Sequence, residues 1–177
     1  MRVRSGQIAD AKAIAGVHVD SWRSTYKGIL PDDFLVSLSY ERRERGWRDI
    51  FANAGRQRSF VYVAEEEAER VVGFVHGGPE REHDPFHKGE LYAIYLLESY
   101  HHKGIGRQLV RVAAQQLIES GFEAMLVWVL ADNPSRRFYE RMGGRQVREK
   151  KIKIGGVDFV EVAYGWSDLR SLSSPIS

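Results

Sequence analysis

Two consecutive stretches of the chain each combine an apolar segment of strand length with a turn and a helix-like segment. In the first, ELYAIYLL (residues 90–97) precedes a turn with glycines at 104 and 106, and apolar residues then recur with helical spacing up to Leu117. In the second, AMLVWVLA (124–131) leads through DNPS into RRFYERMGG (136–144). Apolar runs bounded by turn residues predict buried strands, and the first is apolar enough for burial on both faces. The pattern therefore predicts two successive strand–turn–helix units, with Gly121 ending the first helix.

The remaining segments predict further helices and two hairpins. Periodicity and turn signals indicate a strand over 1–5, a helix over 8–22, a short helix over 31–39, a longer one over 40–55 closed by Gly55, a hairpin over 59–78, a loop over 81–89 and a final hairpin over 145–166. The charged run REKKIKI (148–154) is typical of a protected sheet edge. No repeat or linker interrupts this order.

Length and composition limit the classes of protein that fit. A chain of 177 residues with 43% hydrophobic content predicts one domain over 1–170 and a flexible tail over 171–177. The net charge of only +2 argues against a nucleic-acid partner. The absence of cysteine excludes disulfides, thiolate zinc sites and a cysteine nucleophile. Because no apolar run reaches membrane-spanning length, we expect no membrane association and a cytoplasmic protein. The oligomeric state is left open, a homodimer included.

The glycine turn at 104–106 predicts an anion-binding site. A helix start exposes unpaired backbone N–H groups, and glycines without Cβ atoms let a phosphate approach them closely. A single G-x-G is also compatible with an ordinary turn. A Walker-type loop is excluded because Lys103 precedes the glycines, and a dinucleotide fingerprint fits poorly because Leu109 occupies the third glycine position.

Together, ELYAIYLLESYHHKGIGRQLV (90–110) and VLADNPSRRFYERMGG (129–144) make the chain resemble the GNAT superfamily of N-acetyltransferases over nearly its whole length. That family places a long strand before [Q/R]-x-x-G-x-[G/A], then a strand ending in Asn and a short helix bearing FY. The resemblance implies an α/β fold with a mixed, mostly antiparallel sheet of six or seven strands flanked by helices. It also implies transfer of an acetyl group from acetyl-CoA to an amine, without a metal.

The same resemblance assigns the residues that bind acetyl-CoA. Backbone N–H groups would hold the pyrophosphate, the main chain of Tyr95 and Leu96 would pair with the pantetheine arm, and Asn133 would support the cofactor. The pyrophosphate residues are His102, Lys103, Gly104, Ile105, Gly106 and Arg107. His101 stands where the family usually has Gln or Arg. Because backbone amides make the main phosphate contacts, we expect the site to tolerate this change.

Two side chains are candidates for the chemistry. At the family position of Tyr139, a tyrosine hydroxyl commonly protonates the leaving thiolate, although Tyr139 also fits a core aromatic residue. Glu90 opens the central strand, where some family members carry a glutamate base; it also fits a solvated strand end. With no cysteine, no acyl-cysteine intermediate can form, so direct attack in a ternary complex is expected.

The acceptor site is expected around the first helices. His18, Trp22 and Tyr26 recur at intervals of four residues, so they share a helix face if the helix continues as far as Tyr26. That face is either an acceptor surface or part of the core. We take Trp22, Tyr26 and His76 as substrate-binding candidates. A zinc site formed by His76, Glu80, His83 and His87 is not expected, because Pro85 disrupts helical ligand spacing. The identity of the primary amine, on a small molecule or a protein, stays open. A non-catalytic acyl-CoA sensor is the alternative function.

Overall fold

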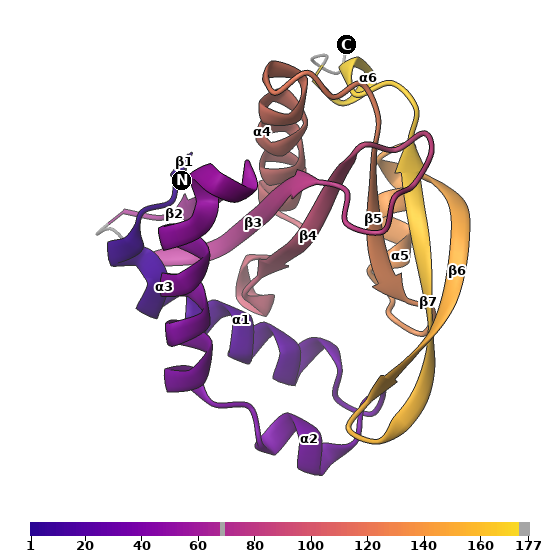
Figure 1. Ribbon diagram of the computed structural model, residues 1–177. Helices are drawn as coiled ribbons and strands as arrows, with labels where there is room; N and C mark the ends of the chain where they lie inside the picture. The colour runs from indigo at the N-terminus through magenta and orange to yellow at the C-terminus, as the bar shows by residue number, and fades with distance from the viewer. Residues whose placement is uncertain (68–69, 174–177) are drawn as a thin grey trace.

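The computed structural model describes residues 1–67 and 70–173 and is built around a seven-stranded sheet. The strands are β1 Arg2–Ser5, β2 Phe60–Glu65, β3 Val71–Pro79, β4 Gly89–Leu96, β5 Met125–Leu130, β6 Arg145–Ile154 and β7 Val157–Trp166. Their order is β1-β2-β3-β4-β5-β7-β6 (Figure 1). Among the strand pairs of the described residues, only β4–β5 is parallel. The predicted mixed, mostly antiparallel sheet is therefore confirmed, and the charged strand β6 lies at its edge.

Helices cover both faces of this sheet (Figure 1). Each face of the sheet has its own apolar core, and alternating residues of β2 contribute to both. Val61 and Val63 pack with α1 and α3, whereas Tyr62 and Ala64 pack on the side of α4. The helical elements are η1 Ile8–Asp10, α1 Ala11–Thr25, α2 Asp32–Val36, α3 Tyr40–Gln57, η2 Glu98–Tyr100, α4 Ile105–Glu119, α5 Arg136–Arg141 and α6 Arg170–Ser173. Gly121, with φ of +86°, follows the end of α4 as predicted.

Strands β4 and β5 separate soon after they meet. Gly89, Glu90 and Leu91 pair with Met125, Leu126 and Val127, but both strands continue well beyond this register. The prediction that β4 is buried on both faces is therefore wrong in part. Residues 89–91 are buried and residues 92–96 are only half-buried, because the neighbouring strand has moved away.

Two other boundaries differ from the sequence prediction. Helix α3 does not stop at Gly55; it ends at Gln57, and Arg58 adopts the left-handed conformation with φ of 53°. The Arg58 guanidinium donates to the Ser120 carbonyl at 3.1 Å and lies over the Phe122 ring, contacts that favour this position of the cap. Of the tail predicted over 171–177, residues 171–173 belong to α6, and Leu172 is buried. Residues 174–177 lie outside the described part of the chain.

No helix in residues 1–67 and 70–173 is long and apolar enough to cross a bilayer.

Candidate active site

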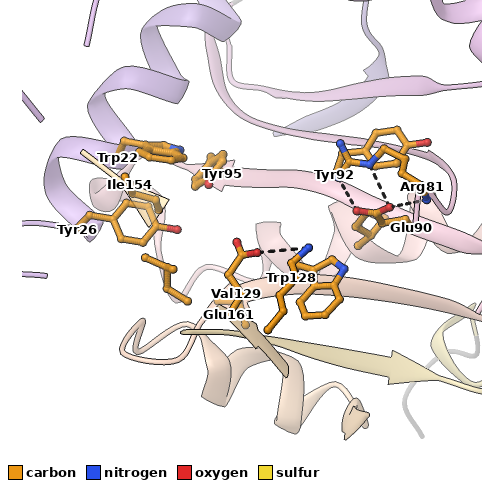
Figure 2. Close-up of a pocket in the computed structure, with 13 residues that line it drawn as sticks. Trp22, Tyr26, Arg81, Glu90, Tyr92, Tyr95, Trp128, Val129, Ile154 and Glu161 are labelled. Carbon is orange, nitrogen blue, oxygen red and sulfur yellow. Dashed lines mark hydrogen bonds and ion pairs between the residues drawn. The ribbon is translucent and has the colours of Figure 1, made fainter. Parts of the chain in front are cut away.

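The separation of β4 and β5 leaves a cavity of about 180 Å³ at the centre of the sheet (Figure 2). Residues from α1, both separated strands and the β6–β7 hairpin contribute to its walls. The lining residues are Trp22, Tyr26, Arg81, Glu90, Leu91, Tyr92, Tyr95, Trp128, Val129, Leu130, Lys150, Ile154 and Glu161. The fold thus brings the predicted residues Trp22, Tyr26, Glu90 and Tyr95 together in one space.

A β-bulge in β4 directs an extra side chain toward this cavity. His76 pairs with Ala93 and Gly77 pairs with Leu91, so Tyr92 is the additional residue on β4. A Cβ atom on Gly77 would lie 2.8 Å from the Glu90 carbonyl oxygen, so this close strand approach requires glycine. Bulges commonly re-aim side chains next to active sites, and Tyr92 is placed in this way.

One end of the cavity, where β4 and β5 are still paired, is closed by an ion pair. Glu90 is 1% exposed, and its carboxylate accepts three hydrogen bonds from Arg81 (Figure 2). The backbone N–H and Nε of Arg81 donate to Oε2 at 3.1 Å each, and a terminal nitrogen donates to Oε1 at 2.5 Å. The Arg81 guanidinium also lies over the Tyr92 ring. Both oxygens of Glu90 are therefore already occupied.

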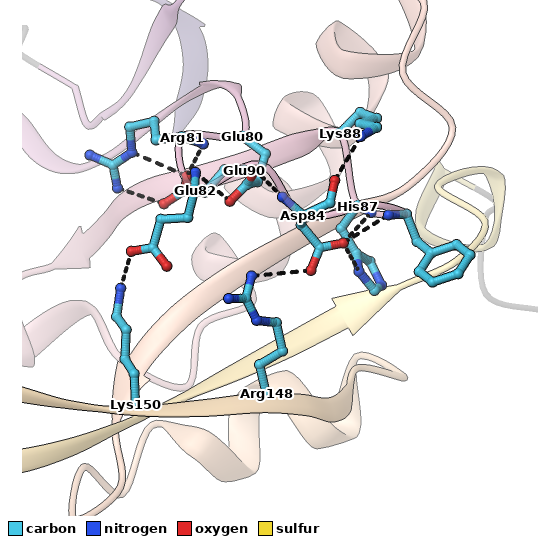
Figure 3. A network of polar contacts seen from close by, with 10 residues as sticks. Glu80, Arg81, Glu82, Asp84, His87, Lys88, Glu90, Arg148 and Lys150 are labelled. Atoms are coloured by element: carbon cyan, nitrogen blue, oxygen red, sulfur yellow. Dashed lines mark hydrogen bonds and ion pairs between the residues drawn. The ribbon is translucent and has the colours of Figure 1, made fainter.

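The loop before β4 is tied to the β6–β7 hairpin by further polar contacts (Figure 3). Asp84 is buried and accepts hydrogen bonds from the backbone N–H groups of Phe86 and His87, while Arg148 of β6 contacts its other oxygen at 3.3 Å. Burial alone would raise the pKa of Asp84, but the hydrogen bonds from His87 and Phe86 lower it to about 2. Lys150 pairs with Glu82 of the same loop. The loop is thus clamped in place.

No group of three or more potential metal-ligating side chains is found within the described residues. The loop residues considered for zinc have other partners: Glu80 accepts hydrogen bonds from the backbone N–H groups of Glu82 and Asp84, and His87 contacts Asp84.

The other end of the cavity, where the strands have parted, carries a second carboxylate. Glu161 of β7 lies opposite Leu130 at the end of β5, and its nearest cation is Lys150, at 3.8 Å (Figure 2). Burial raises the pKa of Glu161 above its usual value, and Lys150 only partly offsets this effect. Glu161 is therefore less neutralised than Glu90.

Aromatic side chains line the open end. The ring centroids of Trp22 and Tyr26 lie 4.9 Å apart, and His18 stacks on Tyr95 at 5.0 Å. His18 and Trp22 of α1 and the C-cap residue Tyr26 thus lie on one side of the helix, as predicted. Burial, with Tyr26 close by, raises the pKa of Tyr95 well above its usual value. The Asn133 amide donates to the Tyr26 hydroxyl at 3.3 Å, which links the end of β5 to α1.

Tyr139 lies beside the cavity rather than among its lining residues. Its ring stacks on Tyr164 at 6.1 Å and packs against Phe138 and Trp166, so it belongs to the core on the α4 side. Burial, and secondly the nearby Tyr26, raise the pKa of its hydroxyl, which keeps Tyr139 protonated at neutral pH. Tyr139 is therefore a core aromatic residue, and its role as the acid that protonates the thiolate stays a prediction.

The glycine turn forms the N-terminus of α4. Gly104 is the N-cap residue with φ of +79°, and His102 also has a positive φ of 61°. The Gln108 N–H donates to the Gly104 carbonyl in the first hydrogen bond of the helix. The N–H groups of Ile105, Gly106 and Arg107 come before it and therefore have no acceptor within the helix. A Cβ on Gly104 would meet no atom within 4 Å, so the space beside it is open. Two other contacts are made in the turn. Nε2 of His101 lies 2.9 Å from the Leu96 carbonyl oxygen, and the Lys103 ammonium lies over the Tyr100 ring.

The sequence did not identify several cavity residues: Arg81, Tyr92, Trp128, Lys150 and Glu161. One signal was available for Glu161. It alternates with Phe159 and Ala163 on one face of the β7 segment, where a single carboxylate among apolar residues is unusual. Tyr92 had no comparable signal, because its direction depends on the bulge.

Sequence comparisons with known proteins point to one family. The acetyltransferase (GNAT) family model matches residues 19–144. N-acetyltransferase YuaI of Bacillus subtilis, which is itself uncharacterised, is 43% identical over 172 residues, covering 97% of this chain and 96% of YuaI.

Solved structures share the fold. A ribosomal-protein-alanine N-acetyltransferase from Brucella melitensis has a TM-score of 0.73 at 23% identity, covering 94% of this chain and 99% of that one. The PaiA N-acetyltransferase from Thermoplasma acidophilum, solved with coenzyme A, has a TM-score of 0.70 at 21% identity, covering 91% and 96%. The chain therefore belongs to the GNAT family of acetyltransferase enzymes.

Proposed function

We propose that this chain transfers the acetyl group of acetyl-CoA to a primary amine by direct attack in a ternary complex. The observation that carries the proposal is the separation of β4 and β5 beside the N-terminus of α4. The separated strands open a cavity for the reacting groups. The helix start offers several backbone donors to an anion outside that cavity.

Acetyl-CoA is the activated acyl donor, and the turn after β4 suits its pyrophosphate. Its proposed ligands are the backbone N–H groups of residues 102–107. The half-buried stretch of β4 with Tyr95 and Leu96 has no β5 partner in the register, so it suits the pantetheine arm. Asn133 supports this arrangement through Tyr26. The bound thioester would then lie between the parted strands.

The attacking amine must first lose a proton, since alkyl amines have a pKa near 10.4. Glu90 and Glu161 both line the cavity, but Arg81 occupies both oxygens of Glu90. We therefore propose Glu161, directly or through water, as the proton acceptor, and Glu90 as the residue that positions Arg81. The raised pKa of Glu161 brings it closer to the operating pH of a general base.

In the transfer step the acetyl group passes from sulfur to nitrogen. The amine nitrogen forms a bond to the acetyl carbon, the C–S bond breaks, and the sulfur takes a proton from the Tyr139 hydroxyl. The new amide nitrogen loses its excess proton, which returns to Tyr139 through solvent. Burial keeps Tyr139 protonated until the thiolate forms.

Free-thiol release and mass spectrometry of the amine, over a panel of primary amines with acetyl-CoA, test this function. We expect a product that carries one acetyl group, and initial rates that give intersecting double-reciprocal lines. Parallel lines would indicate an acyl-enzyme and contradict direct transfer. Acetyl-CoA binding in calorimetry without turnover of any amine would favour the sensor function.

A further inference from the structure

A second, larger chamber of about 470 Å³ lies on the side of the sheet covered by α1 and α3. Arg81 and Tyr92 line both this chamber and the cavity between β4 and β5, so these two side chains form a wall that the two spaces share. Side chains from α1, α3, β3 and β4 contribute to its walls, including His18, Trp47 and His76. An acceptor whose amine enters the first cavity would extend into this chamber.

Three buried nitrogen atoms in the wall have no hydrogen-bond partner in the described part of the chain. They are Nδ1 of His18, Nε1 of Trp47 and Nε2 of His76. The exposed fractions of these residues are 8%, 2% and 8%. The indole N–H can only donate, and a neutral histidine can place its proton on either ring nitrogen. Because buried polar groups are normally satisfied, three such atoms in one wall leave hydrogen-bonding capacity unused, and all three can donate if the histidine protons lie on these nitrogens.

The charge of the chamber points to an anion. Three arginines line it, Arg42, Arg43 and Arg81, and none of its described lining residues is a carboxylate. Arg81 is paired with Glu90, but the half-buried Arg43 guanidinium has no ion pair within residues 1–67 and 70–173. On the same helix, by contrast, Arg48 pairs with Glu44. A partly buried cation without a counter-ion is costly, so a ligand that supplies the charge would bind favourably.

The histidines themselves add no charge near neutral pH. Burial, then Arg43 and His76, lower the pKa of His18 to about 3, and burial, then Arg81, lower that of His76 to about 4. The chamber therefore presents Arg43 as its unpaired, half-buried charge, together with neutral donors. A carboxylate carries one charge and four lone-pair sites, which matches this set better than a doubly charged phosphate does.

We infer that the chamber holds a carboxylate of the acceptor, so that the substrate is an amine that also carries a carboxylate, anchored by Arg43 with Trp47 and the two histidines. This inference rests on the proposed acetyl transfer for the role of the amine. The binding of the carboxylate itself does not depend on turnover, and it can be measured separately.

Calorimetry with a series of ω-amino acids, from glycine to 6-aminohexanoate, tests the binding directly. Each acid is compared with its methyl ester and with the aminoalkylphosphonate of the same length. We expect at least one acid to bind about tenfold or more tightly than its ester, as a charge-assisted contact requires. Equal affinity of acids and esters at every length would overturn the inference, and so would binding of the phosphonates alone.

Variants of α3 assign the contact. Arg43→Gln should remove the preference for acid over ester, and Trp47→Phe should weaken it while retaining the ring. Arg45→Gln is the matched control: it changes an exposed arginine of the same helix that does not line the chamber. Circular dichroism checks folding, and Arg43→Lys, which keeps the charge, should retain the preference. An undiminished preference in folded Arg43→Gln would contradict the assignment.

Thiol release with the same series separates the inference from the proposed function. If both are right, the best acid is also the best acceptor, and Arg43→Gln lowers its kcat/KM toward that of the ester. Acid binding without acetyl transfer would refute the function and leave the anion site. Transfer to neutral amines with equal kcat/KM would refute the anion site and leave the function.

Discussion

The two ends of the cavity between β4 and β5 each carry a glutamate, but the two carboxylates differ in how fully a neighbouring cation neutralises them (Figure 2). At the closed end the strands are paired, and Glu90 receives three hydrogen bonds from Arg81. At the open end the strands have parted, and Glu161 has Lys150 at 3.8 Å. A carboxylate saturated by a cation maintains structure, whereas a less neutralised one can exchange a proton.

The pKa values of neighbouring groups also differ between the two ends of the cavity. The loop at the closed end is held by Asp84, whose pKa is lowered by hydrogen bonds, while burial raises the pKa values of Glu161, Tyr95 and Tyr139 at or beside the open end. Pairs of titratable groups whose environments push their pKa values apart mark different roles. We therefore expect changes at the open end to reduce turnover, and changes at the closed end to reduce stability.

The largest expected effect is on turnover, from Tyr139→Phe. The substitution keeps the ring that stacks on Tyr164 and removes only the hydroxyl that is proposed to protonate the thiolate. We expect kcat to fall roughly 100-fold or more, with little change in acetyl-CoA affinity. Steady-state kinetics and calorimetry on the same preparation measure both quantities. Near-normal turnover between about pH 6 and 10 would show that the proton comes from elsewhere.

The closed end should respond to Asp84→Asn with a loss of stability. The folded-state pKa of Asp84 is about 2, below its unfolded value, so its ionised form stabilises the fold above about pH 4. That contribution is lost as the pH falls toward 2. The variant should unfold about 2 kcal/mol more easily at neutral pH, and the gap should narrow in acid.

Urea unfolding at several pH values measures this difference, and thiol release at neutral pH should stay close to that of the unmodified chain. A large loss of kcat without a loss of stability would assign Asp84 to the chemistry, and would break the distinction between the two ends.

A smaller effect is expected on acetyl-CoA binding from Gly104→Val. The Val side chain would occupy the open space beside the N-terminus of α4, so affinity should fall at least tenfold, or about 1.4 kcal/mol. Gly121→Val is the matched control, because Gly121 has a similar φ of +86° and open surroundings at the other end of α4. Equal affinities of the two variants would mean that backbone strain, rather than phosphate approach, causes any loss.

Local patterns predicted most of the fold. Both strand–turn–helix units, both hairpins and the glycine turn depend on periodicity and turn residues, and the structure confirms them. The end of α3 was missed because Arg58 takes the left-handed position that Gly55 was expected to provide, helped by contacts with Ser120 and Phe122 that are distant in sequence. Long-range contacts of this kind leave no local signal.

The candidate site was predictable where it depends on motifs and not where it depends on packing. Spacing in the sequence predicted the turn at Gly104 and grouped Trp22 with Tyr26, and both of these aromatic residues line the cavity. The direction of Tyr92 depends on a bulge in the β3–β4 register, and the role of Arg81 depends on its contact with Glu90. Both require knowledge of which strands pair and where the pairing ends.

The pH dependence of kcat/KM for Glu161→Gln and Glu90→Gln, measured side by side, tests the central claim most directly. If the open end performs the chemistry, Glu161→Gln should lose about tenfold or more near neutral pH, and the loss should shrink as the pH rises and the amine deprotonates unaided. Glu90→Gln should keep the shape of the profile and lower stability instead, because Arg81 loses its partner. A normal profile for Glu161→Gln, with an activity loss at low pH for Glu90→Gln, would contradict the account.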